Sequence, residues 1–434
     1  MSRVGTGLKR LSTHTLFRGS LWMFLGQGVR VVVQAVYFVL IARALGPQGY
    51  GAFVCVTALA SVLAPFASLG TGNLLIKQVS RDPSCFAAQW GRALAVTAVS
   101  GAALTLAAVS LSYLLLPQAV PFWLVLAVCL ADLICYRLVD VAAQAFQGVN
   151  RLSETSQMML MPNVVRLALL GVLLGLDRHP SVVAWGGVYL LGTAVSALAA
   201  VLFVNARIAG PAFDRSGMGR ELAEGIYFSV SLSSQSVYND IDKTLLSRLA
   251  GLGATGIYGA AYRIIDVSFV PIRSVLYASY RRYFQTGAKG IEGALTFTLK
   301  LLPYMACYGL LASAALFFCA PVVPLILGAQ YAEVVPALRW LALLPLLKVL
   351  HYFAGDTLTG AGYQRARTLC QVAVALINVA LLLWLIPLYS WRGAALASLA
   401  ADLSLALATW YLVLRRVKSE RGCRVGLAPA AQGR

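Results

Sequence analysis

Charged and amide side chains lie inside otherwise apolar stretches of this chain, at spacings that bring them to one helix face. The first stretch covers residues 19–42, where four polar residues recur at intervals of three or four: Gln27, Arg30, Gln34 and Tyr37. At about 100° per residue, these side chains fall within an arc of about 80°, and apolar residues occupy most of the remaining surface. A guanidinium stays charged at any accessible pH and donates several coplanar hydrogen bonds, so this face is suited to binding phosphate oxygens.

Two later segments carry the same kind of chemistry. Residues 256–280 place two positive charges and one negative charge in a similar arc: Arg263, Asp266 and Arg273. Residues 225–247 are polar along their length and include Asn239 and Asp240. Such surfaces are unfavourable against lipid, whereas a hydrated cavity accommodates these donors and acceptors. We therefore predict that these three segments line a substrate cavity.

Other charges inside apolar segments have two possible roles. Arg166 and Lys348 either extend the polar path or pair with acids that hold helices together. Pairing is also an alternative within two segments: Arg263 with Asp266, and Arg137 with Asp140. Three acids are candidates for binding a coupling proton or sodium ion, although ion pairing explains them as well: Asp240, Asp266 and Asp402.

The sequence gives no support for a metal site or another cofactor. Its eight cysteines form no CxxC motif, and its three histidines lie far apart in the chain. A membrane enzyme normally displays a sizeable loop with carboxylates or histidines placed for acid and base work. The outer loops expected here are no longer than about fifteen residues and contain no carboxylate pair. We therefore do not expect an enzyme.

The elements that position these side chains are membrane-spanning helices. The chain has 434 residues, of which 59% are hydrophobic and 12% charged, and it contains long runs without any Asp, Glu, Lys or Arg: residues 45–76, 93–116, 180–206, 301–332 and 368–391. About twenty apolar residues span the hydrocarbon, so each run is long enough to cross it. The runs lack the alternating polarity of a transmembrane β-barrel. An all-α integral membrane fold of about twelve helices follows.

The distribution of basic residues sets the expected orientation. We predict spans at residues 19–42, 50–76, 93–116, 121–146, 158–176, 180–206, 225–247, 256–280, 297–320, 333–358, 368–390 and 393–414. Lys and Arg concentrate in the N-terminus, the even-numbered loops and the C-terminal tail, which places both termini in the cytoplasm. The net charge of +19 is therefore expected to face anionic membrane lipids and not nucleic acid.

An internal repeat indicates two lobes. The string that begins Leu45-Gly46 and ends Tyr50-Gly51 recurs from Leu252-Gly253 to Tyr258-Gly259, and a second echo links Gly148-Val149-Asn150-Arg151 with Gly362-Tyr363-Gln364-Arg365. An even number of spans separates the copies, so the six-helix lobes keep one orientation and form a parallel pseudo-two-fold repeat with a cavity between them. The predicted organisation is a basic leader (1–18), an N-terminal lobe (19–207), a cytoplasmic linker (208–224), a C-terminal lobe (225–415) and a cytoplasmic tail (416–434).

These features resemble a known family. The basic leader, the first helix ending in Leu40-Ile41-Ala42-Arg43-Ala44-Leu45-Gly46-Pro47-Gln48-Gly49-Tyr50-Gly51, and the second helix running through Ser68-Leu69-Gly70 to Lys77-Gln78 are similar to the polysaccharide-biosynthesis (Wzx-type) flippases. That family belongs to the multidrug/oligosaccharidyl-lipid/polysaccharide exporter superfamily. The similarity covers essentially the whole chain.

The resemblance implies a flippase in the bacterial cytoplasmic (inner) membrane. Its expected substrate is an undecaprenyl-diphosphate-linked oligosaccharide, such as an O-antigen (lipopolysaccharide), capsule or exopolysaccharide unit, moved to the outer leaflet by alternating access. A polysaccharide polymerase and a chain-length regulator are its expected protein partners, and a monomer is expected. The peptidoglycan-precursor flippases of the superfamily carry two further C-terminal helices, so that substrate is less favoured.

An ion-coupled drug antiporter of the same superfamily is the main alternative. Antiporters of that kind usually carry cations, so their cavity is expected to be acidic. Residues 19–42 and 256–280 are instead net positive. The positive charge favours an anionic, phosphate-bearing substrate.

Overall fold

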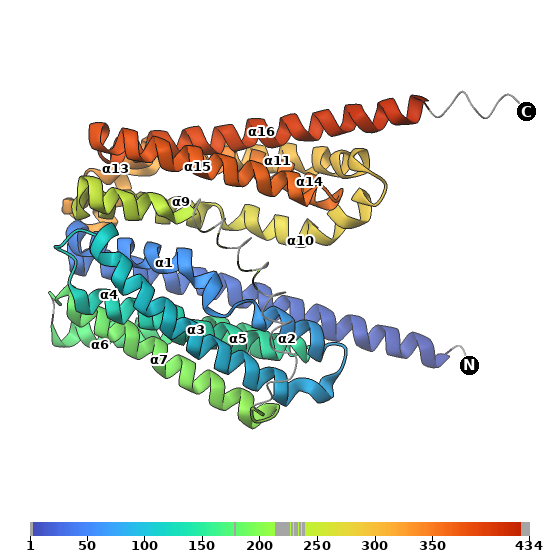
Figure 1. Ribbon diagram of the computed structural model, residues 1–434, viewed down its shortest axis with the longest axis horizontal. Coiled ribbons are helices and arrows are strands. Elements are labelled where there is room, and N and C mark those ends of the chain that lie inside the picture. Colours follow the sequence, from blue (N-terminus) through green and yellow to red (C-terminus); the bar gives the residue numbers. More distant parts are fainter. Residues whose placement is uncertain are drawn as a thin grey trace, which may run out of the picture. The chain divides into compact units, whose positions relative to one another are not determined.

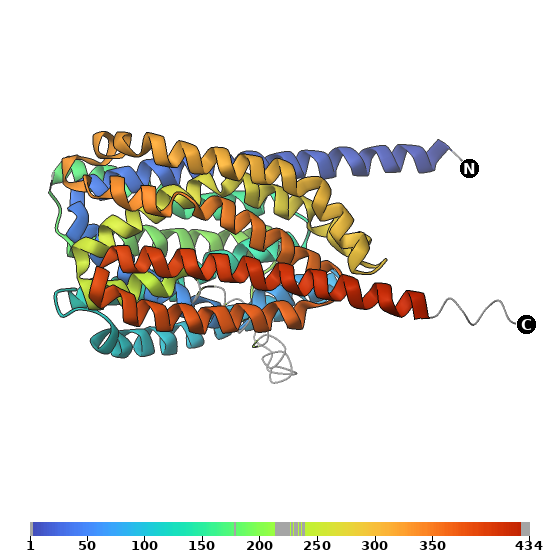
Figure 2. The same cartoon turned by 90° about the horizontal axis from the view of Figure 1, so that it is seen from above.

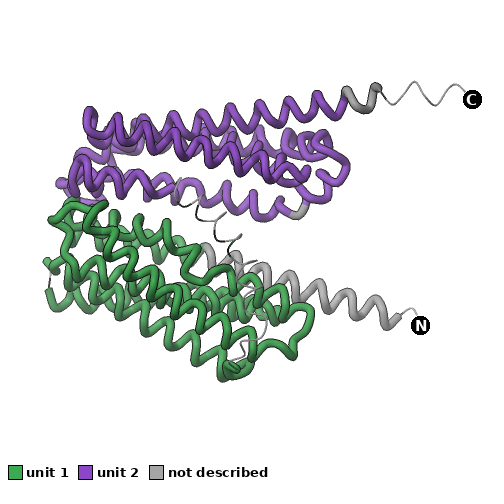
Figure 3. The backbone as a smooth tube through the Cα atoms, in the orientation of Figure 1, with its two compact units in different colours: residues 1–236 green, residues 237–434 purple. Residues whose placement is uncertain are grey.

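The computed structural model of the protein describes residues 3–177, 179–212 and 239–426, together with four single residues between 226 and 236. Within these ranges it describes side chains from residue 28 to residue 421, except at 281. All regular secondary structure in this part is helical, which confirms the all-α fold class. The chain divides into two compact units, unit 1 (Met1–Ser236) and unit 2 (Val237–Arg434), which Figure 3 distinguishes by colour. Most of the linker predicted at 208–224 lies outside the described residues, so the predicted lobe boundaries stay a prediction.

Nine helices of the described part are long and apolar enough to cross a membrane. One of them, Gly28–Ala67, has 40 residues, about twice what one span needs, and Gly46 interrupts it with φ 63° and ψ 178°. It therefore counts as two segments. The remaining predicted spans, 225–247 and 256–280, correspond to the partly described helix at 239–250 and to a pair of shorter consecutive helices. The about twelve predicted spans are thus all represented.

Unit 1 is a bundle of long helices and shorter connecting helices (Figure 1). They are α1 (Arg3–Ala67), α2 (Thr71–Val79), α3 (Phe86–Leu115), α4 (Phe122–Cys129), a π-helical turn (Leu130–Cys135), α5 (Tyr136–Gly148), α6 (Leu152–Leu176) and α7 (Val182–Arg207). The span predicted at 50–76 is not continuous, because Leu69 and Gly70 have positive φ and separate α1 from α2. A buried cluster that includes Trp90, Phe146 and Val204 joins α3, α5 and α7.

Unit 2 has the same all-helical construction. After the helical residues 239–250 it contains α9 (Leu252–Ser268), α10 (Val270–Gly287), α11 (Ile291–Cys319), α12 (Val323–Leu327), α13 (Val334–Leu341), α14 (Leu344–Gly360), α15 (Gln364–Tyr389) and α16 (Trp391–Gly426). The helices α15 and α16 run side by side in both views (Figures 1 and 2). The span predicted at 256–280 is broken at Phe269, which separates α9 from α10 and packs in a buried cluster with Phe353 of α14.

The internal repeat is visible in backbone geometry, with a register that differs from the one expected from sequence. Gly46 (φ 63°, ψ 178°) matches Gly251 (φ 90°, ψ 169°), whereas Gly253, its expected counterpart, is helical. The turn after α5, with Asn150 at φ 60°, matches the turn after α14, with Gly362 at φ 85°. In both turns a backbone N–H donates to a carbonyl oxygen five residues earlier: Arg151 to Phe146 at 2.9 Å and Tyr363 to Leu358 at 2.8 Å. This hydrogen bond is typical of a helix C-terminus closed by a residue with positive φ.

Candidate functional site

The polar face of α1 is intact in unit 1. Arg30 is half-buried, and its Nη2 donates to the hydroxyl of Tyr136 at 3.3 Å. Gln34 donates from Nε2 to Oδ1 of Asn163 at 3.0 Å. No carboxylate lies within 4.0 Å of Arg30 among the described residues. The guanidinium that the sequence singled out therefore lacks an acidic partner in this part of the chain.

Of the other two residues of this predicted face, the structure describes the side chain of Tyr37 but not that of Gln27. Tyr37 lies one helical turn after Gln34 and packs against Trp185 of α7, with ring centroids 5.2 Å apart. The side chain of Gln27 lies outside the described residues, although its backbone belongs to α1. Spacings of four and three residues put Arg30, Gln34 and Tyr37 on one face of the helix.

Arg166, predicted as a secondary binding residue, lies in a buried network of polar contacts. It is 9% exposed, its Nε donates to Thr193 Oγ1 at 2.8 Å, and its Nη2 lies 3.5 Å from Oδ1 of Asp132. The guanidinium also stacks over Tyr189, 3.8 Å from the ring centroid. Tyr189 in turn donates to Asp132 at 2.7 Å. These contacts correspond to the pairing alternative for Arg166.

Tyr136 connects the charges of unit 1 and was not identified from the sequence. Its hydroxyl accepts from Arg30, and its ring lies 5.1 Å and 5.5 Å from the guanidinium carbons of Arg137 and Arg166. Arg137 forms an ion pair with Asp140 at 2.8 Å, as the pairing alternative expected. Because Arg137 and Arg166 each have a carboxylate, the excess positive charge of this cluster resides on Arg30.

A π-helical turn supplies the acid of this cluster. Residues Leu130–Cys135 form the turn, and Asp132 lies within it. Such single turns are rare and are frequently found at functional sites, because the extra residue redirects neighbouring side chains. A β-carbon at Gly101 of α3 would meet the carbonyl oxygen of Leu133 at 2.6 Å, so the turn needs a glycine opposite it. Gly101 and Asp132 can be read from the sequence, but the π-helical turn itself cannot be recognised there.

In unit 2, Lys243 and Lys348 each lie beside an aspartate. Lys243 donates from Nζ to Asp240 Oδ1 at 2.6 Å and to the carbonyl oxygen of Asn239 at 2.9 Å. Asp242, 2% exposed, accepts from the hydroxyl of Tyr258 at 2.6 Å. The predicted residues Asn239 and Asp240 therefore belong to a helix-internal charge network.

The three residues predicted on 256–280 are spread over α9 and α10. Asp266 lies 3.9 Å from Nζ of Lys348. The ion pairs of the described residues do not include one between Asp266 and Arg263. Arg263 is half-buried on α9, and Arg273 is exposed on α10 with its guanidinium 5.9 Å from the Phe269 ring. Lys348, the other secondary candidate, is 8% exposed, and its neighbouring acid is Asp266 of α9.

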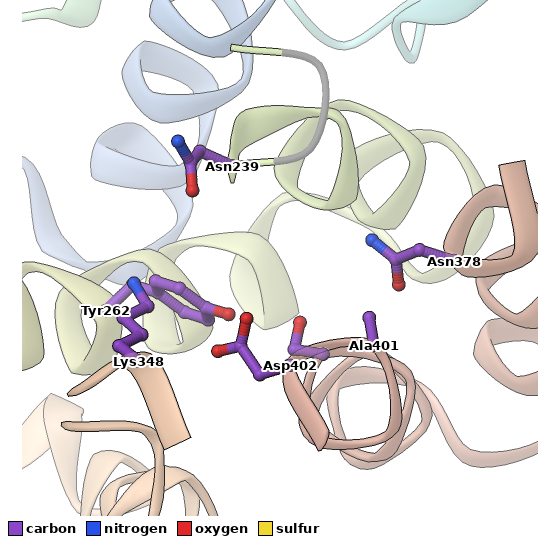
Figure 4. A pocket seen from close by; sticks show the side chains of 7 residues that line it. Asn239, Tyr262, Lys348, Asn378, Ala401 and Asp402 are labelled. Atoms are coloured by element: carbon purple, nitrogen blue, oxygen red, sulfur yellow. The ribbon is translucent and has the colours of Figure 1, made fainter. Parts of the chain in front are cut away.

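Unit 2 encloses a small polar pocket (Figure 4). It is lined by Asn239, Tyr262, Lys348, Asn378, Ser398, Ala401 and Asp402. Tyr262 and Asp402 point toward one another in this view, and the amino group of Lys348 lies beside the Tyr262 ring. Asp402 also lies 3.5 Å from Nε2 of the buried His351. The pocket volume is about 10 Å³, about that of one water molecule, so it cannot hold a sugar. In the described residues no group of three or more His, Cys, Asp or Glu side chains is placed to hold a metal ion.

Comparisons with solved structures show the fold. The chain is similar to an inward-facing conformation of a multidrug resistance MATE family transporter of the MOP superfamily, with a TM-score of 0.77 and 16% identity over 90% of this chain and 96% of that one. An outward-facing conformation of such a transporter gives a TM-score of 0.62 and 17% identity over 94% and 96%.

Comparison with family models identifies the family. No curated protein matches the chain. The model of the family described as polysaccharide biosynthesis protein matches residues 16–277, which is more than half of the 434 residues. The expected family resemblance is therefore confirmed, and the chain belongs to the polysaccharide biosynthesis protein family.

Proposed function

We propose that this protein is a flippase for an undecaprenyl-diphosphate-linked oligosaccharide, which it moves from the inner to the outer leaflet of the bacterial cytoplasmic membrane by alternating access. Family membership and the transporter fold support the class of activity. The substrate is proposed from the chemistry of α1. Both termini are placed in the cytoplasm by the positive-inside pattern of the sequence.

The observation that carries the proposal is Arg30. A charge inside the hydrocarbon costs about 3 kcal/mol or more unless it meets a partner or water, and Arg30 has only the neutral hydroxyl of Tyr136 among its described contacts. Its remaining N–H groups are available to an anion. A diphosphate presents several oxygens that a guanidinium binds in a bidentate manner, so it satisfies both the charge and the hydrogen bonds.

The rest of the α1 face fits the sugar part of such a substrate. Gln34 and Asn163 form an amide pair that offers further donors and acceptors for hydroxyl groups. Tyr37 adds an aromatic surface beside Trp185. Amides and aromatic rings do not select among sugars by charge, so this face is suited to neutral hydroxylated rings of varied identity.

The experiment is complementation in a strain that lacks the flippase, followed by transport of a fluorescent diphosphate-linked oligosaccharide in proteoliposomes. Arg30→Ala removes about two charge-assisted hydrogen bonds, worth about 3 kcal/mol together, so the apparent affinity should fall about a hundredfold. Arg30→Lys should recover part of it. Arg137→Ala is the matched control, because Arg137 contacts the same tyrosine but already pairs with Asp140. Normal polymer from a stably inserted Arg30→Ala variant would refute the assignment.

A cation antiporter is the second candidate, because the solved structures of similar fold are multidrug transporters. The charge of the described α1 cluster opposes it, since a cation would meet the uncompensated guanidinium of Arg30. An ethidium accumulation assay separates the two functions. We expect cells that produce the protein to accumulate the dye as control cells do, whereas energy-dependent extrusion would favour the antiporter.

A further inference from the structure

Arg339 lies on an exposed face of unit 2 and is not one of the residues of the proposed site. Its guanidinium packs 5.3 Å above the ring of Phe317, and its Nε lies 3.4 Å from the Phe317 carbonyl oxygen. Its side chain is on α13, in the apolar segment Val334–Gly360. This guanidinium is therefore anchored through Nε, and the described hydrogen bonds do not use its terminal amino groups.

The protein provides no counter-charge for Arg339 in the described residues. Four cations within the predicted spans do lie within 4.0 Å of a carboxylate: Arg137, Arg166, Lys243 and Lys348. Arg339 has no such ion pair there. A cation at the edge of the hydrocarbon without a protein partner is stabilised by water or by an anion from the membrane. The charge is thus open to an anionic group that the membrane supplies.

A groove adjoins this guanidinium. It is lined by Phe317 of α11 and by Pro336, Arg339 and Trp340 of α13, and its volume is about 480 Å³. Positions 336, 339 and 340 fall on one helical face. Neighbouring residues are strongly exposed hydrophobics, with Phe318 75% exposed, so the groove opens onto a lipid-facing surface.

The groove lies near one end of the helices of unit 2. Arg339 comes five residues after the first residue of α13, which corresponds to about 8 Å along the helix axis. Within unit 2, α13 lies at the end opposite the C-terminal end of α16 (Figure 1). Tryptophan is enriched at membrane interfaces because its ring has an apolar body and a polar N–H, and Trp340 is 42% exposed in the groove.

We infer that this groove binds one anionic phospholipid, with the Arg339 guanidinium on its phosphate, Trp340 beside its ester groups, and Phe317 and Pro336 against the first part of an acyl chain. A guanidinium edge matches phosphate geometry, and the apolar walls require a ligand whose remainder is hydrocarbon. A free phosphate lacks that second part. The site is independent of Arg30 and of the proposed transport activity.

The test is native mass spectrometry of the purified full-length protein titrated with phosphatidylglycerol. Arg339→Gln removes the charge and keeps the length of the side chain, and Arg392→Gln is the matched control, since Arg392 is also exposed and lies 5.4 Å from a tryptophan ring but outside the groove. Loss of a charge-assisted contact should weaken the tightest phosphatidylglycerol site about tenfold in Arg339→Gln and leave it unchanged in Arg392→Gln.

Two further measurements keep the inference open to refutation. Thermal unfolding without added lipid should be the same for wild type and Arg339→Gln, which excludes general misfolding. Inorganic phosphate at millimolar concentration should not displace the lipid, since the apolar part contributes to binding. Equal lipid affinity in Arg339→Gln and wild type, an equal loss in Arg392→Gln, or displacement by phosphate alone would each overturn the inference.

Discussion

Removing the acid of the buried cluster in unit 1 should destabilise the protein. In Asp132→Asn, Arg166 keeps its bond to Thr193 and its stacking on Tyr189 but loses its only described carboxylate. Arg166 is 9% exposed, so its charge is poorly solvated after the change. Breaking a buried pair from one side costs about 3–5 kcal/mol, and the retained contacts place this case near the lower limit, at about 3 kcal/mol.

The matched control lies on the same span. Asp140 pairs with Arg137 at 2.8 Å, but the two side chains are 31% and 24% exposed. Solvent screening therefore limits the effect of Asp140→Asn to less than about 1 kcal/mol. The two variants remove the same chemical group from one helix and differ in the burial of its partner.

The assay is thermal unfolding in detergent, and its readout is the fraction of protein that stays monodisperse at each temperature. We expect the midpoint of Asp132→Asn to fall by about 5 °C and that of Asp140→Asn to change by about 1 °C. A double variant, Asp132→Leu with Arg166→Met, should recover part of the loss, because it removes both charges and leaves none unpaired. Equal midpoints for the two single variants would refute the argument that burial of Arg166 makes its carboxylate necessary.

Three further outcomes follow from backbone and loop geometry. Gly287→Ala should lower the free energy of unfolding by about 3 kcal/mol, because a β-carbon there would lie 2.1 Å from the carbonyl oxygen of Gly360. Chemical denaturation measures this free energy. Gly362→Ala should cost about 1 kcal/mol in the same assay, since its φ is 85° but the space around it is open. The pKa of Asp82 is lowered because Ser84 donates to it from its hydroxyl and its backbone N–H. This capping is present above the unfolded-state pKa of about 4 and is lost as pH falls through the lowered pKa. Asp82→Asn should therefore abolish the pH dependence of the protection factor of the Ser84 amide, that is, of its hydrogen exchange relative to the intrinsic rate at each pH.

Most helices could be predicted because apolar runs decide where a membrane helix lies. The span expected at 180–206 is α7, and the span expected at 368–390 lies within a residue or a turn of α15. Interruptions inside such runs do not change hydropathy, so the breaks at Gly70 and Phe269 were missed. A signal existed at the second break, since Pro271 disfavours helical continuation through the residues just before it.

Only the part of the candidate site that lies on a single helix could be predicted from the sequence. Periodicity placed Arg30 and Gln34 on one face of α1, which requires no knowledge of other helices. Their partners Tyr136 and Asn163 lie 106 and 129 positions away in the chain. Contacts over such distances depend on how helices pack, and a pattern within one segment contains no information about them. The π-helical turn that holds Asp132 was missed for the same reason.

The repeat duplicates the scaffold of the protein but not its charge pattern. The turns after α5 and α14 have the same hydrogen bonds, as expected if both units descend from one helical plan. In unit 2, however, Lys243 and Lys348 each lie within 4.0 Å of an aspartate, whereas Arg30 in unit 1 has no such partner among the described residues. A lysine already bound to a carboxylate must give up that pair before it can bind a phosphate, and Arg30 has no pair to give up. Anion recognition is therefore expected to depend more strongly on unit 1, and Arg30→Ala should reduce substrate affinity more than Lys348→Ala does.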